Sequence, residues 1–328
     1  MRQLGRGKRS LPWARIFCSG FSQKTGKPGK IPETEMDDGL MDQKAIAAYV
    51  KERICSSVRK RKPFILAANW KMNKTSYETR QYLEALSHYR FSRRNTVIIF
   101  PPSFYLPLFQ ENADPRIRYG PQNLYCERKG AFTGELSPWM ARELGCSCCI
   151  LGHSERRNLF HETDELIGRK VSACLKAGLH PVLCIGEHLE ERRSESWKSV
   201  LCRQLERDLA GVDGAGAARI VIAYEPVWAI GTGESASPEQ IEEAHGAIRQ
   251  ELISLFGFAA GSGIPILYGG SAGPGNIGRI ALCGNVSGFL IGTASLDVQK
   301  FIQMMDLVNE ESQNPGETGS GEAYGIAR

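Results

Sequence analysis

The chain has 328 residues, and its 42% hydrophobic and 23% charged content is ordinary for a globular protein. The net charge of +5 is uneven, because residues 1–62 hold 15 Lys and Arg against 6 Asp and Glu, whereas the remainder holds 26 against 30. The slightly acidic body argues against nucleic-acid binding, and no apolar run approaches the ~18 residues of a membrane span.

The first 41 residues are the most basic part of an N-terminal extension. Residues 1–30 carry eight Lys or Arg and no acid, which suits an organellar transit peptide, although prolines and glycines interrupt any long amphipathic helix. Met36 and Met41 are alternative translation starts. A transit peptide, a docking segment and an upstream start are therefore alternative interpretations of residues 1–41, and we expect the body to work in the cytoplasm.

Two further segments flank the body. Residues 42–58 predict a short amphipathic helix with one apolar stripe, formed by Ile46, Val50, Ile54 and Val58. This helix either packs on the body or docks a partner, and a basic linker at 59–62 ends the extension. At the other end, Asn, Glu, Gly, Ser and Thr dominate, which predicts a disordered tail at 309–328.

The body, residues 63–308, alternates short apolar runs with longer amphipathic segments. The apolar runs are 64–68, 96–100, 117–120, 148–152, 181–185, 220–224, 264–268 and 288–291. Helical segments such as 76–89, 164–177, 195–209 and 238–256 intervene. Eight strand–helix units in about 245 residues predict an α/β fold, a single (β/α)8 barrel. The rival, a doubly wound open sheet, usually has a glycine-rich turn after its first strand, and NWKMN at 69–73 is no such turn.

The ten cysteines have no regular spacing and do not read as a disulfide framework. Cys146 and Cys149 have a C-x-x-C spacing, but neither a second pair nor matching histidines complete a zinc site. We expect Cys149, Cys184 and Cys283 to be buried, reduced and hydrophobic in character, in a reducing compartment. We expect no metal site.

The most informative stretch is AYEPVWAIGTG at 223–233. The apolar run before it predicts a buried strand that delivers Glu225 at its carboxyl end. Pro226 ends the ladder because proline has no backbone donor, and apolar residues follow up to the flexible Gly231 and Gly233. A carboxylate at a strand end, followed by an apolar loop, is the layout of a base beneath a closing lid.

In a barrel the active site lies at the carboxyl ends of the strands, so polar residues just past the strands are candidate functional residues. They are Asn69, Lys71, His153, Ser154, Glu155, Glu225, Ser271, Gly292 and Thr293. A lysine, a histidine and a glutamate that converge on one face form a proton-transfer set. Each residue alone is more often a solvated or structural loop residue, so the interpretation depends on their joint placement.

From residue 64 to about 308 the chain resembles the triosephosphate isomerase family. The motifs that carry the resemblance are NWKMN (69–73), GAFTGE (130–135), LGHSERR (151–157), the stretch at 223–233 and YGGS (268–271). The resemblance implies an aldose–ketose isomerase, an intramolecular oxidoreductase of glycolysis and gluconeogenesis. Such an enzyme interconverts dihydroxyacetone phosphate and D-glyceraldehyde 3-phosphate through an enediolate, without a cofactor or metal.

The resemblance also implies roles for individual residues. Glu225 matches the base that moves a proton between C1 and C2, and His153 matches the neutral imidazole that polarises the carbonyl. Lys71 matches the cation that steadies the enediolate and the phosphate, with Asn69 beside it. Glu155 matches the carboxylate that partners this lysine.

The surroundings of these residues follow from the same resemblance. Backbone N–H groups near Gly231, Ser271, Gly292 and Thr293 would bind the phosphate. We also expect Ser154 to cap a helix that starts at the next residue, so that the positive helix end keeps the imidazole neutral.

The family is dimeric, and the loop at 123–137 projects into the neighbouring subunit. The resemblance therefore implies a homodimer in which Thr133 lies beside the partner's residues that match Asn69 and Lys71. The expected partners are this second copy and a small phosphorylated triose, with no nucleic acid and no membrane.

The sequence departs from the family pattern at four positions. Thr293 stands where a second glycine is usual, and its side chain would narrow the phosphate pocket. Glu234 replaces a common lysine at the end of the lid, and Ala272 and Ser287 replace a common Val and Asp. The alternatives to a triosephosphate isomerase are a related isomerase of another small sugar phosphate and a non-catalytic binding barrel.

Overall fold

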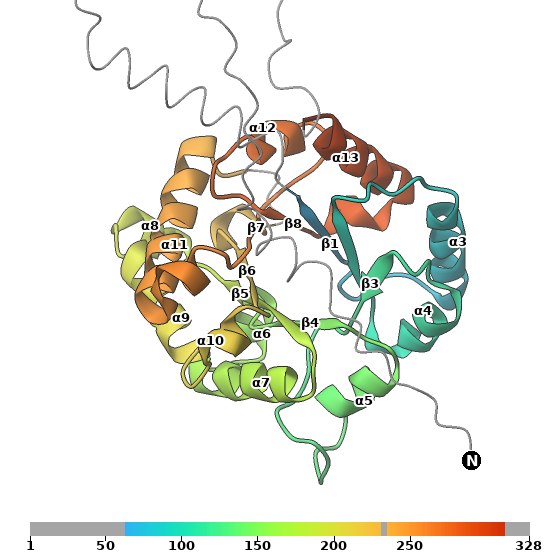
Figure 1. Cartoon of the computed structure of the whole chain (residues 1–328), viewed down its shortest axis with the longest axis horizontal. Helices are drawn as coiled ribbons and strands as arrows, with labels where there is room; N and C mark the ends of the chain where they lie inside the picture. The colour runs from blue at the N-terminus through green and yellow to red at the C-terminus, as the bar shows by residue number, and fades with distance from the viewer. Residues whose placement is uncertain (1–62, 231–234, 312–328) are drawn as a thin grey trace, which may run out of the picture. The chain divides into compact units, whose positions relative to one another are not determined.

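Eight parallel strands form a barrel inside a ring of helices in the computed structural model of the chain (Figure 1). The structure describes residues 63–230 and 235–311, so the expected helix at 42–58, Gly231 and Glu234 lie outside the described residues. The strands are β1 (Ile65–Asn69), β2 (Thr96–Phe100), β3 (Ile117–Tyr119), β4 (Cys148–Leu151), β5 (His180–Ile185), β6 (Val221–Tyr224), β7 (Ile266–Tyr268) and β8 (Gly288–Ile291).

The strand order closes the sheet on itself. It runs β3-β2-β1-β8-β7-β6-β5-β4, with every ladder parallel. β3 and β4 stand at the two ends of this order, and Ser147 N donates to Tyr119 O at 3.0 Å, while Ile150 N donates to Pro121 O at 3.1 Å. These bonds join the last pair of strands, so the prediction of a (β/α)8 barrel is confirmed.

The first and last strands of the barrel are direct neighbours. Ile65 on β1 pairs with Thr96 on one side and with Gly288 on the other. Side chains reinforce this junction, because the buried Tyr82 hydroxyl donates to Ser295 O at 2.8 Å, and Lys74 Nζ donates to Leu296 O at 2.7 Å.

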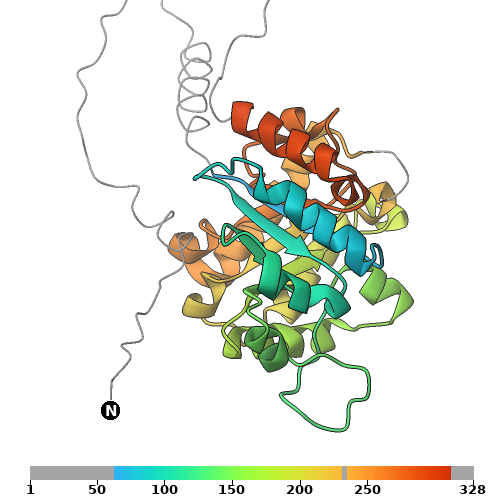
Figure 2. The same ribbon diagram turned by 90° about the vertical axis from the view of Figure 1, so that its right-hand side faces the viewer.

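Helices separate the strands and cover the outside of the barrel (Figures 1 and 2). They are α3 (Ser76–Ser87), α4 (Leu106–Asn112), α5 (Pro138–Glu143), α6 (Ser154–Leu159), α7 (Asp164–Lys176), α8 (Leu189–Arg193), α9 (Trp197–Asp208), α10 (Gly214–Ala217), α11 (Pro238–Gly261), α12 (Ile277–Ala281) and α13 (Val298–Glu311). The described residues also form three short 3-10 turns, namely η1 (Ser103–Tyr105), η2 (Val227–Ala229) and η3 (Thr293–Leu296). α13 runs three residues past the expected boundary at 308, and residues 312–328 lie outside the described residues.

Capping side chains define where the long helices begin. Thr75 and Ser237 each open a capping box, at α3 and α11 respectively, in which the cap side chain and a residue three positions on satisfy each other's backbone N–H groups. α11 continues beyond the expected end at 256 across a kink at Gly257, whose φ of 75° glycine adopts without strain.

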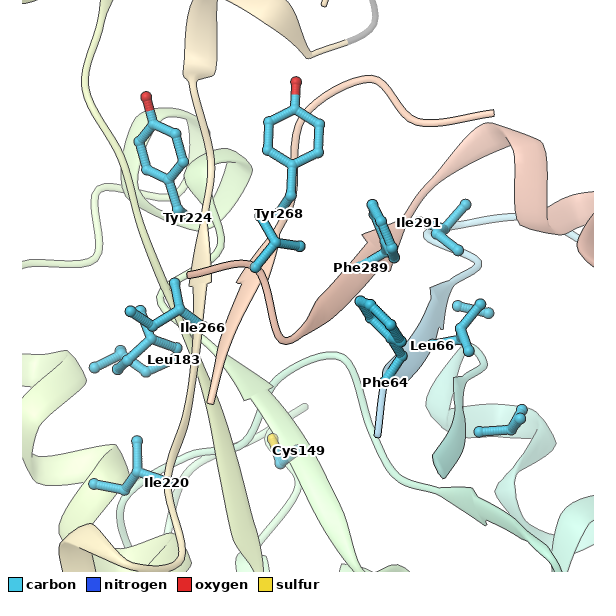
Figure 3. Close-up of a cluster of buried hydrophobic side chains, with 14 of the residues drawn as sticks. Phe64, Leu66, Cys149, Leu183, Ile220, Tyr224, Ile266, Tyr268, Phe289 and Ile291 are labelled. Carbon is cyan, nitrogen blue, oxygen red and sulfur yellow. The ribbon is translucent and has the colours of Figure 1, made fainter. Parts of the chain in front are cut away.

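The core has two layers because alternate residues of each strand face opposite sides. On β6, Val221 and Ala223 belong to the cluster inside the barrel, whereas Ile222 and Tyr224 belong to the cluster between strands and helices. Figure 3 shows part of the outer cluster, including Phe64 and Phe289, whose rings stack with centroids 6.4 Å apart. Strands buried on both faces explain the continuous apolar runs in the sequence.

The cysteines follow the expected pattern. Cys149, Cys184 and Cys283 are all buried, and the first two lie in β4 and β5 without a disulfide. In the described part of the chain, no helix is long and apolar enough to cross a membrane, and no group of three His, Cys, Asp or Glu residues is placed to hold a metal ion.

His180 begins β5, so it lies at the end of the barrel opposite to the carboxyl ends of the strands. Its side chain is buried, and its Nδ1 donates to Arg219 O at 3.0 Å. Burial lowers the pKa of His180 to about 4, and the positive charges of Arg219, Arg118 and Arg142 act in the same direction. The folded protein therefore holds this imidazole in its neutral form at pH values where an exposed histidine is charged.

We expect the free energy of unfolding to fall as the pH drops from about 6.5 to about 4. In this window the unfolded chain binds a proton at residue 180 that the folded chain refuses, so acid favours unfolding, by ~3 kcal/mol across the window. His180→Asn keeps a donor without titrating and should show a flatter slope, whereas His88→Gln, which changes an exposed histidine, should match the parent. Urea midpoints at one protein concentration measure the slopes, and equal slopes for the parent and His180→Asn would refute this account.

Candidate active site

A cavity of about 400 Å³ opens at the carboxyl ends of the strands. Its lining includes Asn69, Lys71, His153, Glu225, Ser271, Gly292 and Thr293, all of which the sequence analysis selected. Glu155 is outside the lining but forms an ion pair with Lys71, whereas Thr133 lies in an exposed loop between β3 and α5. The structure thus brings to one cavity the expected proton-transfer set and those expected phosphate-binding residues that it describes, whereas Gly231 lies outside the described residues.

The Glu225 carboxylate is buried directly after β6, with 2% of the residue exposed. Its Oε2 accepts a hydrogen bond from Ser154 N at 2.8 Å, and its Oε1 lies 3.1 Å from His153 Nε2. Glu225 N donates to Ile185 O at 2.8 Å, so the backbone that carries the carboxylate is fixed to β5. Both carboxylate oxygens are therefore engaged by one turn of chain after β4.

This turn does not form as the sequence analysis expected. The prediction that Ser154 caps the helix is wrong, because α6 starts at Ser154 and His153 is its N-cap. The His153 Nδ1 accepts a hydrogen bond from Glu155 N at 3.2 Å, while the Ser154 N–H is taken by Glu225. Because Nδ1 accepts this bond, the ring proton is placed on Nε2, which faces the carboxylate.

Lys71 has a left-handed backbone with φ of 52°, which a non-glycine residue adopts only when its surroundings enforce it. Asn69 Oδ1 accepts from Lys71 N at 3.0 Å, and Gln122 Nε2 donates to Lys71 O at 2.8 Å. The ammonium then lies 2.7 Å from Glu155 Oε1. Partial burial would raise the pKa of Glu155, but the hydrogen bond from Lys71 and the neighbouring positive groups together outweigh burial and lower it.

Two glycines on the neighbouring strands make room for the base. A Cβ at Gly186, just past β5, would lie 1.8 Å from the Glu225 carbonyl oxygen. A Cβ at Gly269, just past β7, would lie 3.0 Å from Glu225 Cγ. Any other residue at Gly186 must displace the end of β6, so the position of the carboxylate depends on these glycines.

Glu187 anchors the start of the apolar loop and was not among the residues expected from the sequence. It is fully buried, and its Oε1 accepts hydrogen bonds from Tyr224 OH at 2.9 Å and Trp228 Nε1 at 3.0 Å. Val227 N also donates to Glu187 O at 3.1 Å, and burial raises the pKa of the carboxyl. Glu187 follows β5 as the other candidates follow their strands, so the same positional rule would have found it.

The far end of the cavity is built from backbone. Ser271 begins a turn in which Asn276 Nδ2 donates to Ser271 O at 3.1 Å, and Ser295 Oγ donates to Gly292 O at 2.7 Å. These side chains fix the two loops whose N–H groups were expected to meet a phosphate. Thr293 lies in the lining with its side chain exposed, and Ala272 lies beside Ser271 in the same wall.

Comparison with known proteins identifies the family. A family model described as triosephosphate isomerase matches residues 64–308. The chain belongs to the triosephosphate isomerase family.

Relatives that carry the family name match the chain over nearly their whole length. The triosephosphate isomerase of Nitratidesulfovibrio vulgaris is 45% identical over 247 residues, which are 74% of this chain and 98% of the relative. That of Endomicrobium trichonymphae is 42% identical over 248 residues, or 75% and 98%. That of Thermus thermophilus is 41% identical over 242 residues, or 74% and 97%. The recognition made from the motifs is therefore confirmed.

Gly186→Ala should sharply reduce triosephosphate isomerase activity without unfolding the barrel. The added methyl group forces the backbone of Glu225 to move, and a shift of about 1 Å at a catalytic group costs ~10²-fold in rate. Gly269→Ala repeats the test with a milder clash. Gly246→Ala on α11, where an added Cβ has no neighbour within 4 Å, is the matched control. Folded Gly186→Ala and Gly269→Ala variants with unchanged kcat would show that these glycines do not fix the position of the Glu225 carboxylate.

Proposed function

We propose that the chain is an active triosephosphate isomerase, which interconverts dihydroxyacetone phosphate and D-glyceraldehyde 3-phosphate by proton transfer through an enediolate. The observation that supports it most directly is the buried Glu225 carboxylate, 3.1 Å from His153 Nε2, in a cavity that also contains Lys71. A base, a neutral donor and a cation in one cavity are the groups that proton abstraction next to a carbonyl requires.

Glu225 acts as the base in this proposal. Its two oxygens now accept from Ser154 N and from the His153 imidazole. To take a proton from C1 of the substrate, the carboxylate exchanges these contacts for the carbon-bound hydrogen, and it returns the proton to C2 in the second half of the reaction. Both carbon–proton transfers use the same carboxyl group. The hydroxyl proton moves from O1 to O2 of the enediolate through the His153 imidazole, which gives its Nε2 proton to one oxygen and takes a proton from the other.

His153 and Lys71 stabilise the charge that develops on oxygen. The Nε2–H that now faces Glu225 is the donor for the substrate oxygen, and the cap bond from Glu155 N keeps Nδ1 an acceptor while this happens. The Lys71 ammonium supplies positive charge for the enediolate and the phosphate. Asn69 fixes the backbone that delivers this ammonium.

A second cavity, of about 550 Å³, lies on the other side of Glu225, but its charges do not suit a phosphate. Arg157 Nη1 lies 2.7 Å from Asp164 Oδ1, and Arg207 Nη1 lies 2.9 Å from Glu165 Oε1. Glu162 and Glu191 also line this cavity, so carboxylates outnumber arginines there. The substrate dianion therefore belongs in the smaller cavity.

The substrate is the family's triose phosphate. The alternative of another small sugar phosphate finds no support in the family match or in the three relatives described above. The enzyme acts in glycolysis and gluconeogenesis, and the cytoplasm is its compartment. Buried cysteines outside disulfides, such as Cys149 and Cys184, support a reducing environment.

The enzyme is a homodimer in this proposal. The loop between β3 and α5 projects from the body of the barrel in both views (Figures 1 and 2), and Thr133 is exposed on it. Met72, next to Lys71, is 95% exposed, and Phe104 on η1 is 87% exposed. A second copy would cover these apolar side chains and would bring Thr133 to the partner's site.

Glu225→Gln tests the assignment of the base. The amide keeps the shape and an acceptor oxygen but takes no proton from carbon, so kcat should fall toward the upper end of the ~10²–10⁴-fold range for general-base loss. Steady-state kinetics in both directions measure the loss, with Glu190→Gln on the exposed face of α8 as the control. A folded Glu225→Gln enzyme that keeps more than about a tenth of kcat would remove Glu225 from this role.

Phe104→Asp tests the dimer. A charge in an apolar interface must be desolvated, so this variant should dissociate at a concentration where the parent is dimeric, and its kcat should fall with it. Phe258→Asp on α11, where the phenylalanine is 75% exposed, is the matched control and should remain dimeric. Sedimentation velocity at several concentrations gives the answer. A fully active parent monomer would rule out completion of the site by Thr133.

A further inference from the structure

We propose that Lys300, on the first turn of α13, binds the substrate phosphate. The inference rests on the proposed function, and it names a residue outside the set that the family resemblance supplied. Lys300 lines the same 400 Å³ cavity as Ser271, Gly292 and Thr293, at the end where backbone N–H groups gather. A second lysine therefore lines the cavity beside the residues expected to bind the phosphate.

The charges of the cavity leave this ammonium uncompensated. Among the described residues, two lysines line the cavity, Lys71 and Lys300, and the first is held 2.7 Å from the Glu155 carboxylate. Among residues 63–230 and 235–311, none forms an ion pair with Lys300, which is exposed. The phosphate of the substrate carries about two negative charges at neutral pH. Lys71 is already paired with Glu155, so the Lys300 ammonium would balance part of the negative charge of the phosphate.

The backbone of Lys300 is fixed, so the side chain starts from a defined point. Asp297 Oδ1 accepts from Gln299 N at 2.9 Å and from Lys300 N at 3.2 Å. The Asp297 carboxylate is thereby directed at the start of α13 and occupied by backbone donors. Lys300 has to order only its own flexible stem when an anion binds.

Helix stability gives no reason for a lysine at this position. The start of a helix carries partial positive charge, so an ammonium in the first turn is repelled by the helix end. The Asp297 carboxylate already caps the N–H groups of this helix start, so an anion in the adjoining cavity would attract the ammonium that the helix start repels. Lys300 therefore fits an anion site better than it fits the unliganded helix.

The location predicts which kinetic constants Lys300 controls. It contacts the cavity at the phosphate end and is not among the residues that meet Glu225 or His153. An interaction with a phosphate that does not change during the reaction is equally strong in the ground state and the transition state, so it acts on KM and leaves kcat unchanged. Its charge should also accelerate encounter with the dianion at low salt.

Lys300→Ala is tested in the full-length enzyme with four measurements. We expect about a fivefold rise in KM for D-glyceraldehyde 3-phosphate and in the inhibition constant of inorganic phosphate, with kcat within about twofold. The salt dependence of kcat/KM should weaken. Turnover of unphosphorylated D-glyceraldehyde should not change. Lys300→Arg should restore the KM, and Lys176→Ala, an exposed lysine at the end of α7, is the matched control.

Each outcome decides the proposal. Unchanged KM and unchanged phosphate inhibition in Lys300→Ala would overturn it, and so would an equal loss of D-glyceraldehyde turnover, which would indicate a structural role. If the parent enzyme has no isomerase activity, the proposed function fails. Calorimetric titration with inorganic phosphate still tests Lys300 in that case, because equal affinities of parent and Lys300→Ala would refute the inference.

Discussion

The contact between the Glu225 carboxylate and the turn after β4 is the interaction on which the site depends. Ser154 N and His153 Nε2 hold the two carboxylate oxygens, and this turn is also the first turn of α6. A single helix start therefore fixes the base, selects the ring nitrogen that carries the proton and places the donor for the substrate. Gly186 and Gly269 keep the neighbouring strands clear of the same carboxylate. The start of α6 therefore determines both how the Glu225 carboxylate is packed and which nitrogen of His153 carries the proton.

Glu187 gives the apolar loop a fixed start. A buried carboxyl normally costs stability, because burial penalises its charged form. Here the hydroxyl of Tyr224 and the indole of Trp228 satisfy one of its oxygens, and this ties the end of β6 to η2. Glu187 lies where the loop leaves the barrel, so a polar contact inside an apolar layer fixes the start of this loop.

Much of the fold could be predicted from the sequence because barrel strands are buried on both faces. The observed strands begin and end within two residues of the apolar runs, and even the polar His180 joins β5 because its N–H pairs with Ser147 O. Catalytic candidates could be predicted because their residue types follow the strands directly. What could not be predicted is which side chain takes which backbone N–H, as the cap at His153 shows. Lys300 was not predicted because it lies in α13, beyond η3, where only the three-dimensional cavity relates it to the site.

The pairing of β1 with β8 has a consequence for synthesis on the ribosome. β1 is made first, but one of its edges has no partner until residues 288–291 emerge, and the Tyr82 hydroxyl has no acceptor until Ser295 arrives. Loop closure between segments this distant in sequence is slow. The nascent chain therefore carries an open sheet edge for most of its translation, and a chaperone that covers such edges would act on β1 before the barrel can close.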